Sequence, residues 1–129
     1  MAAVPHDGDM LALSDIVRET SFEIHKYLRS GFTEKIYENA LAHRLRKLGI
    51  KAEQQQCVRV FDEDGTLLGL LRIDILINKM LICEVKSCHT LVDAHTAQIL
   101  GYLRATHIEH GLLINFGAPK LQIRKFILT

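Results

Sequence analysis

Two neighbouring segments rich in aliphatic residues, 67–77 and 80–87, restrict the fold of this chain more than any other feature of its sequence. The segments 67–77 and 80–87 are largely aliphatic and predict two strands, and Asn78-Lys79 between them predicts a tight turn. Because the connection is so short, we expect the two strands to be antiparallel. Charged side chains in such strands are costly unless they are paired, hydrogen-bonded or bound to a metal. Four such side chains occur here: Arg72, Asp74, Glu84 and Lys86.

The order of the other elements defines the fold class. Helical spacing of apolar residues predicts helices from Leu13 to Leu28 and from Tyr37 to Leu48. A strand over 57–61 precedes the turn sequence 62–65, and a helix from about residue 90 is followed by strands over 111–116 and 121–128. The strand–helix–strand unit over 80–116 predicts a parallel strand pair with a right-handed crossover. The sequence therefore predicts an α/β fold with a mixed sheet flanked by helices.

Composition and charge limit the class of protein. The 129 residues are 48% hydrophobic and 24% charged, which is typical of one globular domain spanning 1–129, with a flexible N-terminal segment expected over 1–11. A formal net charge of +1 argues against a strongly basic nucleic-acid coat protein. Three cysteines without a CxxC pair predict neither a disulfide framework nor a zinc knuckle. No secretory signal and no membrane-spanning run is recognisable, so we expect a cytoplasmic protein.

Two carboxylates in the apolar strands are the first candidate site residues. Opposite residues in an antiparallel pair point to the same face, so Asp74 meets Glu84 only if the hairpin is centred on Lys79. A two-residue Asn78-Lys79 turn would instead place Asp74 opposite Cys83 and turn Glu84 away. The functional interpretation thus makes a prediction about strand register.

A divalent cation is one solution to the proximity of these two acids. At a separation of about 4 Å and an effective dielectric constant of about 20, two like charges repel by roughly 4 kcal/mol. A cation would remove that cost, and oxygen ligands suit Mg²⁺ or Mn²⁺ better than zinc. The alternative is a plain ion-pair network in which Asp74 pairs with Arg72 or Lys86, and the spacing alone does not choose between the two.

Two helical segments supply further candidates. Glu34 shares a helical face with Tyr37, Glu38 and Leu41, so we expect Glu34 to point inward and Glu38 to be peripheral. Glu34 is also explained as a first-turn acid favoured by the helix dipole. Gln98 and Tyr102 are spaced i, i+4 on the helix after Lys86, and the alternative there is a polar edge of an amphipathic helix.

At these residues the chain resembles a known family. Residues 31–37, Gly-Phe-Thr-Glu-Lys-Ile-Tyr, match the pattern that gives the GxxExxY proteins their name, a small bacterial branch of the PD-(D/E)XK nuclease-like superfamily. The resemblance covers roughly residues 12–127 and implies a restriction-endonuclease-like core. It continues through Arg72-Ile73-Asp74, Glu84-Val85-Lys86, His95-Thr96-Ala97-Gln98, Gly101-Tyr102-Leu103 and residues 111–117.

The resemblance also implies roles for individual residues. Asp74 and Glu84 resemble the metal-binding carboxylates, with the Val85 carbonyl as a further ligand and Lys86 as the motif lysine. Glu34 resembles the helix-borne acid that completes the site. The pair Gln98 and Tyr102 resembles the Gln-x-x-x-Tyr element of the exonuclease-like branch. One departure is Ile73, which stands where the superfamily name has proline.

Together these residues predict a metal-dependent nuclease that hydrolyses phosphodiester bonds of DNA or RNA with Mg²⁺ or Mn²⁺ as cofactor. Lys86 would orient water or stabilise developing charge, while Arg72, Gln98 and Tyr102 would contact the nucleic acid. The alternatives are a catalytically silent nucleic-acid-binding or regulatory module of the same fold, and a structural interaction protein whose charges form an ion-pair network. Because specific nucleic-acid interfaces bury about 1,000–2,500 Å² of protein, so small a domain suggests a homodimer or a protein partner.

Overall fold

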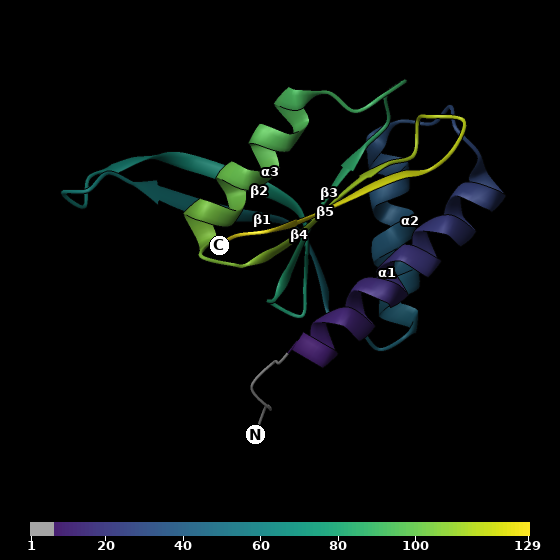
Figure 1. Cartoon of the computed structure of the whole chain (residues 1–129), viewed down its shortest axis with the longest axis horizontal. Coiled ribbons are helices and arrows are strands. Elements are labelled where there is room, and N and C mark those ends of the chain that lie inside the picture. The colour runs from purple at the N-terminus through teal and green to yellow at the C-terminus, as the bar shows by residue number, and fades with distance from the viewer. Residues whose placement is uncertain (1–6) are drawn as a thin grey trace.

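A mixed sheet of five strands, with helices against both faces, forms the fold in the computed structural model, which describes residues 7–129 (Figure 1). Its helices are α1 (Asp7–Leu28), α2 (Glu34–Lys47) and α3 (Asp93–Thr106). Its strands are β1 (Ala52–Phe61), β2 (Leu67–Ile77), β3 (Leu81–Lys86), β4 (His110–Asn115) and β5 (Gln122–Ile127). The element order agrees with the predicted one, and the fold class is confirmed as α/β.

The strands lie in the sheet in their order along the chain, β1-β2-β3-β4-β5. All neighbours are antiparallel except β3 and β4, which are parallel and are joined through α3. The predicted parallel pairing of the two strands in this strand–helix–strand unit is therefore confirmed. A single parallel pair places the carboxyl ends of β3 and β4 side by side, next to the start of α3.

Two hydrophobic clusters cover the two faces of the sheet. On one face, α1 and α2 pack on β2, β3 and β4 through residues such as Val17, Leu41 and Cys83. On the other face, Ile99 and Leu103 of α3 pack on Ile73, Ile82 and Leu113. The alternation along β3 is regular: Leu81, Cys83 and Val85 lie in the first cluster and Ile82 in the second. Because strand side chains alternate, Glu84 and Lys86 share the face of Ile82, which is the side of α3.

Two boundaries differ from the sequence predictions. Helix α1 begins at Asp7, so the part of the expected flexible segment from residue 7 to 11 is helical, while residues 1–6 lie outside the described part of the chain. The helix extends this far because Met10 is buried in the core beside Leu13. Strand β1 begins at Ala52, five residues before the predicted start at Cys57, because Glu53, Gln54 and Gln56 pair with β2 despite their low strand propensity.

Residues 29–33, between α1 and α2, are fixed to the sheet. Gly31 has φ of +123°, a conformation that favours glycine. The Tyr37 hydroxyl donates to the Arg29 carbonyl and accepts from the backbone N–H of Phe32, while the Ser87 hydroxyl donates to the Phe32 carbonyl at 2.6 Å. Since Ser87 follows Lys86 directly, these bonds fix the beginning of α2 close to the end of β3.

The Tyr37 hydroxyl is expected to contribute measurably to stability. Its ring is fully buried and stacks on Phe116, with centroids 4.8 Å apart, so Tyr37→Phe keeps the packing and removes only the two hydrogen bonds. We expect a loss of about 1–3 kcal/mol in the free energy of unfolding, measured by urea denaturation. Tyr27→Phe, at a site that is 77% exposed, is the matched control and should change nothing. Equal stability of both variants would contradict this role for Tyr37.

Within residues 7–129, none of the helices is long and apolar enough to cross a lipid bilayer.

Candidate active site

The strand register required to bring Asp74 and Glu84 together is present. Ile75 pairs with Cys83 and Ile77 with Leu81, so the hairpin is centred on Lys79. Asn78 and Lys79 both have positive φ, and the Met80 N–H donates to the Ile77 carbonyl as in a two-residue turn. Met80 is then an extra unpaired residue before β3, which shifts the register by one. The register that the functional interpretation requires is thus confirmed.

The two carboxylates replace backbone groups where β2 and β3 separate. Regular pairing stops at Ile75 and Cys83. Beyond it, the backbone N–H of Asp74 donates to Glu84 Oε2 at 3.2 Å, and the backbone N–H of Val85 donates to Asp74 Oδ2 at 2.8 Å. Each side chain therefore lies against the opposite strand, and each is oriented by a main-chain donor. Two acids held this way form a rigid pair rather than two mobile surface groups.

The electrostatics of this pair are unfavourable without a cation. Glu84 is only 2% exposed, and the pKa of its carboxyl is raised to about 9. Burial is the larger cause of this increase, and the neighbouring Asp74 carboxylate is the second. Lys86 opposes this shift, but its effect is smaller. Glu84 is therefore protonated at neutral pH in the isolated chain, unless a positive charge is placed beside the pair.

Glu84→Gln is expected to stabilise the metal-free protein in a pH-dependent manner. A carboxyl whose pKa is raised on folding contributes stability below its unfolded value of about 4.5, and this contribution is lost as pH rises through about 9. In EDTA, the free energy of unfolding of the variant should therefore rise relative to that of the wild type as the pH increases from about 4.5 to about 9. The difference should reach about 1 kcal/mol or more at pH 8. Thermal unfolding at pH 5, 6.5 and 8 measures the trend. A stability difference that does not change with pH would contradict it.

A second group of site residues connects β3 to α3. Lys86 Nζ donates to Gln98 Oε1 at 2.8 Å, and Gln98 Nε2 donates to the Tyr102 hydroxyl at 3.2 Å. The structure thus brings these three predicted site residues into one hydrogen-bonded chain beside Glu84. Arg72 is exposed on β2, two residues before Asp74.

The orientation of the two acids on α2 is the reverse of the prediction. Glu34 is exposed, whereas Glu38 is buried with 4% exposure. The buried face of α2 starts at Tyr37, and residues 31–36 are all exposed, because the first turn of the helix extends past the packed core. Glu34 therefore does not join Asp74 and Glu84 in this structure. Among residues 7–129, no three histidine, cysteine or acidic side chains come close enough together to hold a metal ion.

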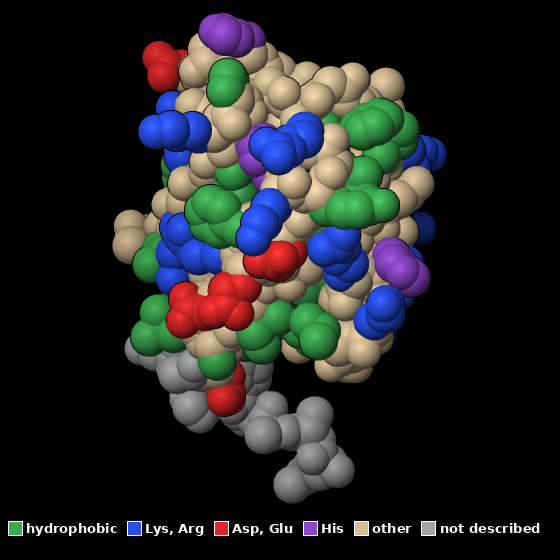
Figure 2. Space-filling model, turned by 90° about the vertical axis from the view of Figure 1, so that its right-hand side faces the viewer, with side chains coloured by type: hydrophobic (Ala, Val, Ile, Leu, Met, Phe, Trp, Pro, Cys, Tyr) green, Lys and Arg blue, Asp and Glu red, His purple; other side chains and the backbone are tan. Residues whose placement is uncertain are grey.

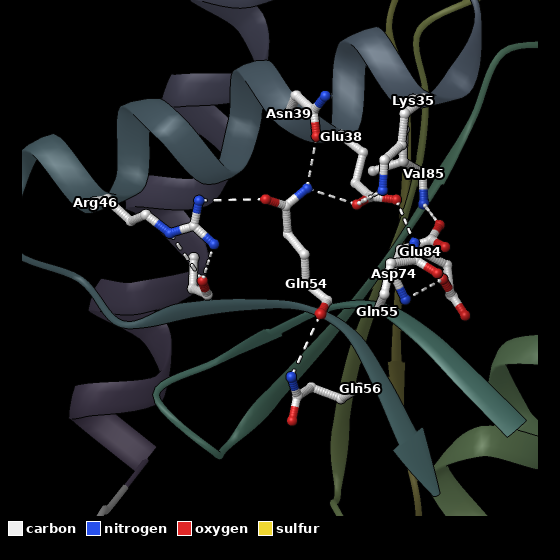
Figure 3. A network of polar contacts seen from close by, with 11 residues as sticks. Lys35, Glu38, Asn39, Arg46, Gln54, Gln55, Gln56, Asp74, Glu84 and Val85 are labelled. Carbon is white, nitrogen blue, oxygen red and sulfur yellow. Dashed lines mark hydrogen bonds and ion pairs between the residues drawn. The ribbon is translucent and has the colours of Figure 1, made fainter.

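A polar network that the sequence analysis missed surrounds Glu38 (Figure 3). Its carboxylate accepts from Gln54 Nε2 at 2.6 Å, from Gln55 Nε2 at 2.7 Å and from Lys35 Nζ at 3.1 Å. These bonds tie α2 to β1 next to the Asp74–Glu84 pair (Figure 3). With three donors already on its oxygens, Glu38 acts as a structural anchor. The three consecutive glutamines, 54–56, inside a strand were the signal in the sequence that pointed to such a network.

Gln55 also marks a change of direction in the sheet. Its φ is +54°, and it lies opposite Asp74, between the regular pairs Gln54–Ile75 and Gln56–Ile73. Ile75 belongs to the cluster under α2, whereas Ile73 belongs to the cluster under α3. Residues two apart in a strand normally share a face, so β2 rotates at Asp74. This rotation is what turns the Asp74 carboxylate toward β3.

The residues present suit a divalent cation. Asp74 and Glu84 supply hard oxygen donors, and a positive charge beside them would lower the pKa of Glu84, which burial and the neighbouring Asp74 carboxylate raise. The hollow between α1 and α2 also contains two glutamates, but basic side chains accompany them, and Figure 2 shows basic and acidic side chains mixed over this side of the molecule. That hollow is lined by Glu19, Thr20, Glu23, His43, Arg44, Lys47 and Leu48, none of which is a predicted site residue.

Comparisons with known proteins agree with this fold. The crystal structure of SSO0001 superposes with a TM-score of 0.61 at 20% sequence identity, over 72% of this chain and 48% of that one. This likeness confirms a restriction-endonuclease-like core, and the chain spans about half the length of SSO0001. Comparison with curated proteins gives no significant match.

A family model identifies the chain more closely. The model of the PD-(D/E)XK nuclease superfamily matches residues 12–126. The chain therefore belongs to the PD-(D/E)XK nuclease superfamily. Nucleases of this superfamily generally use divalent metal ions.

Proposed function

We propose that this protein is a divalent-metal-dependent nuclease that hydrolyses phosphodiester bonds in DNA or RNA. The observation that carries the proposal is the pairing of Asp74 with Glu84 at the point where β2 and β3 separate, with Lys86 two residues further along β3. Membership of the superfamily supports it. We also place the chain in the GxxExxY branch on the basis of residues 31–37.

In the proposed site, Asp74, Glu84 and the Val85 carbonyl hold Mg²⁺ or Mn²⁺. A cation there supplies Lewis-acid polarisation of the scissile phosphate and a water of lowered pKa. The two main-chain N–H donors keep Asp74 and Glu84 aligned, so the site does not have to reorganise when the substrate binds. Lys86 places its ammonium group next to the reacting phosphate and stabilises the negative charge that develops on it.

The remaining proposed residues bind the substrate. The Gln98 side chain, held between Lys86 and Tyr102, orients the lysine and directs its amide toward phosphate oxygens. Tyr102 contacts a base or sugar, and Arg72 binds phosphate from the exposed part of β2. Glu34 lies on the exposed first turn of α2, from which it would reach a second ion or its water only once substrate is bound.

Cleavage assays with defined substrates test the proposal. Single- and double-stranded DNA and RNA are incubated with the purified protein in Mn²⁺, Mg²⁺ or EDTA, and Asp74→Asn serves as the inactive control. We expect at least one substrate to be cleaved in Mn²⁺ or Mg²⁺, and none in EDTA or by the variant. Binding of nucleic acid without cleavage under every condition would instead favour the catalytically silent nucleic-acid-binding module. Cleavage in EDTA would contradict the proposed metal dependence.

A further inference from the structure

The outer part of the β1–β2 hairpin, residues 57–72, projects beyond the body of the molecule (Figure 1). We call these residues the arm. Its ladder continues through the pairs Cys57–Arg72 and Arg59–Leu70. Since opposite residues share a face, these four side chains lie on one face of the arm, and all four are exposed. The other face is partly covered, because Val58 packs on the cluster under α3.

The arm exposes several large apolar side chains, although a two-stranded ribbon by itself is only marginally stable in water. Leu68 is 63% exposed, Leu70 61%, Phe61 54% and Leu67 51%. These four side chains belong to one short hairpin, whereas exposed apolar groups on a soluble surface are normally scattered singly. Strand β1 is also an edge of the sheet, so one side of its backbone is open to pairing. Both features are typical of a surface that another chain covers.

The charges on the arm indicate what kind of chain covers this surface. Arg72 and Arg59 lie toward the base, the exposed leucines and Phe61 lie in the middle, and Asp62, Glu63 and Asp64 form the tip. Within the described residues, neither arginine forms an ion pair with these acids or with any other. The sequence of charges along the arm is therefore positive, apolar, negative. Such a surface is complementary to itself when a copy is turned around and laid against it.

We propose that the arms of two copies of this chain pack antiparallel about a two-fold axis to form a homodimer. In this arrangement the acidic tip of each arm meets Arg59 of the other arm, and the apolar middles bury one another. A two-fold axis is the symmetry that such a self-complementary patch requires. Nucleic acid fits this surface less well, because the acidic tip would repel phosphate. The proposal does not depend on whether the protein cleaves nucleic acid.

Sedimentation equilibrium of the full chain over 1–200 µM tests for the dimer. We expect the wild type to dimerise within this range and Leu70→Glu to be monomeric throughout, with Leu68→Glu as a second variant in case the first does not fold. Tyr27→Glu, which places the same charge at a 77% exposed site on α1, should dimerise like the wild type. A wild type that stays monomeric at 200 µM, or a dimer that Leu70→Glu leaves intact, would overturn the proposal.

A charge exchange between two chains tests the tip-to-base contact itself. Arg59→Glu and Glu63→Lys should each weaken self-association at least tenfold, since each homodimer then contains two like-charge contacts. An equimolar mixture of the two variants should dimerise again, because each glutamate then faces a lysine and each remaining arginine a glutamate. A mixture that stays monomeric would overturn the antiparallel arrangement. So would an Arg59→Glu variant that keeps the wild-type association and instead loses nucleic-acid binding.

Discussion

Lys86→Ala should reduce metal-dependent cleavage by about 10²–10³-fold while leaving the protein folded. The ammonium group is the only cation that the structure places in hydrogen-bond contact with the Gln98–Tyr102 pair within the described residues. It lies at the end of β3, two residues beyond Glu84, where a phosphate that bridges to the carboxylate site would develop negative charge. Its removal therefore affects the transition state more than it affects substrate binding.

Two measurements separate this catalytic effect from a structural one. Lys86 is half-buried, and its hydrogen bond to Gln98 is exposed, so the free energy of unfolding should change by less than about 1 kcal/mol. Lys120→Ala removes the same charge from an exposed loop and should leave cleavage unchanged. Cleavage by Lys86→Ala at the wild-type rate would remove this residue from the mechanism. Loss of activity together with loss of folding would show that it acts through stability.

Gly117→Ala is expected to destabilise the protein by about 3 kcal/mol, which corresponds to a fall of roughly 10 °C in Tm. A Cβ atom at Gly117 would lie 2.3 Å from the Cys88 nitrogen and 2.6 Å from the Cys88 oxygen, both backbone atoms that cannot rotate away. The buried Asn115 joins the same two loops, because its Oδ1 accepts from the N–H groups of Cys88 and Gly117 at 3.0 Å each. The substitution would therefore separate the ends of β3 and β4, directly beside Lys86.

Gly101→Ala is the matched control for this prediction. Gly101 lies inside α3, and the nearest atom to its added Cβ would be the end of the flexible Arg104 side chain at 3.8 Å. Alanine there should stabilise the protein by about 0.5–1 kcal/mol, since glycine is a poor helix former. Differential scanning calorimetry of both variants should show shifts of opposite sign. A Gly117→Ala variant as stable as the wild type would mean that the two loops do not pack as described.

The sequence predicted the arrangement of elements well because the pattern of apolar residues is clear in most of them. Strands 111–116 and 67–77 are mostly aliphatic, interrupted only by Asn115 in the first and by Arg72 and Asp74 in the second, and both appear close to the predicted bounds. The register of the β2–β3 hairpin could only be stated as two alternatives. It depends on Met80 remaining unpaired and on two hydrogen bonds between Asn78 and Lys51, the residue just before β1. The Asn78 backbone N–H donates to the Lys51 carbonyl, and the Asn78 side chain accepts from the Lys51 N–H. No local pattern contains that long-range contact.

The candidate site was predictable only in part for the same reason. Asp74, Glu84 and Lys86 stand out because charges are rare in buried strands. The orientation of Glu34 and Glu38 could not be read from helical spacing, since both lie on the face that includes Tyr37, and only the position of the sheet beneath α2 distinguishes them. Likewise, the left-handed conformation of Gln55 depends on its bond to Glu38 and its place opposite Asp74.

Binding of Mn²⁺ measured by isothermal titration calorimetry at pH 7.5 tests the central claim most directly, since it asks whether Asp74 and Glu84 form a site for a divalent cation. The protein should bind Mn²⁺ in the absence of substrate, and Asp74→Asn and Glu84→Gln should each weaken that binding at least tenfold. Glu109→Gln, which changes an exposed acid near β4, should bind as the wild type does. Wild-type protein that binds no Mn²⁺, or binding that all three variants retain equally, would contradict the account.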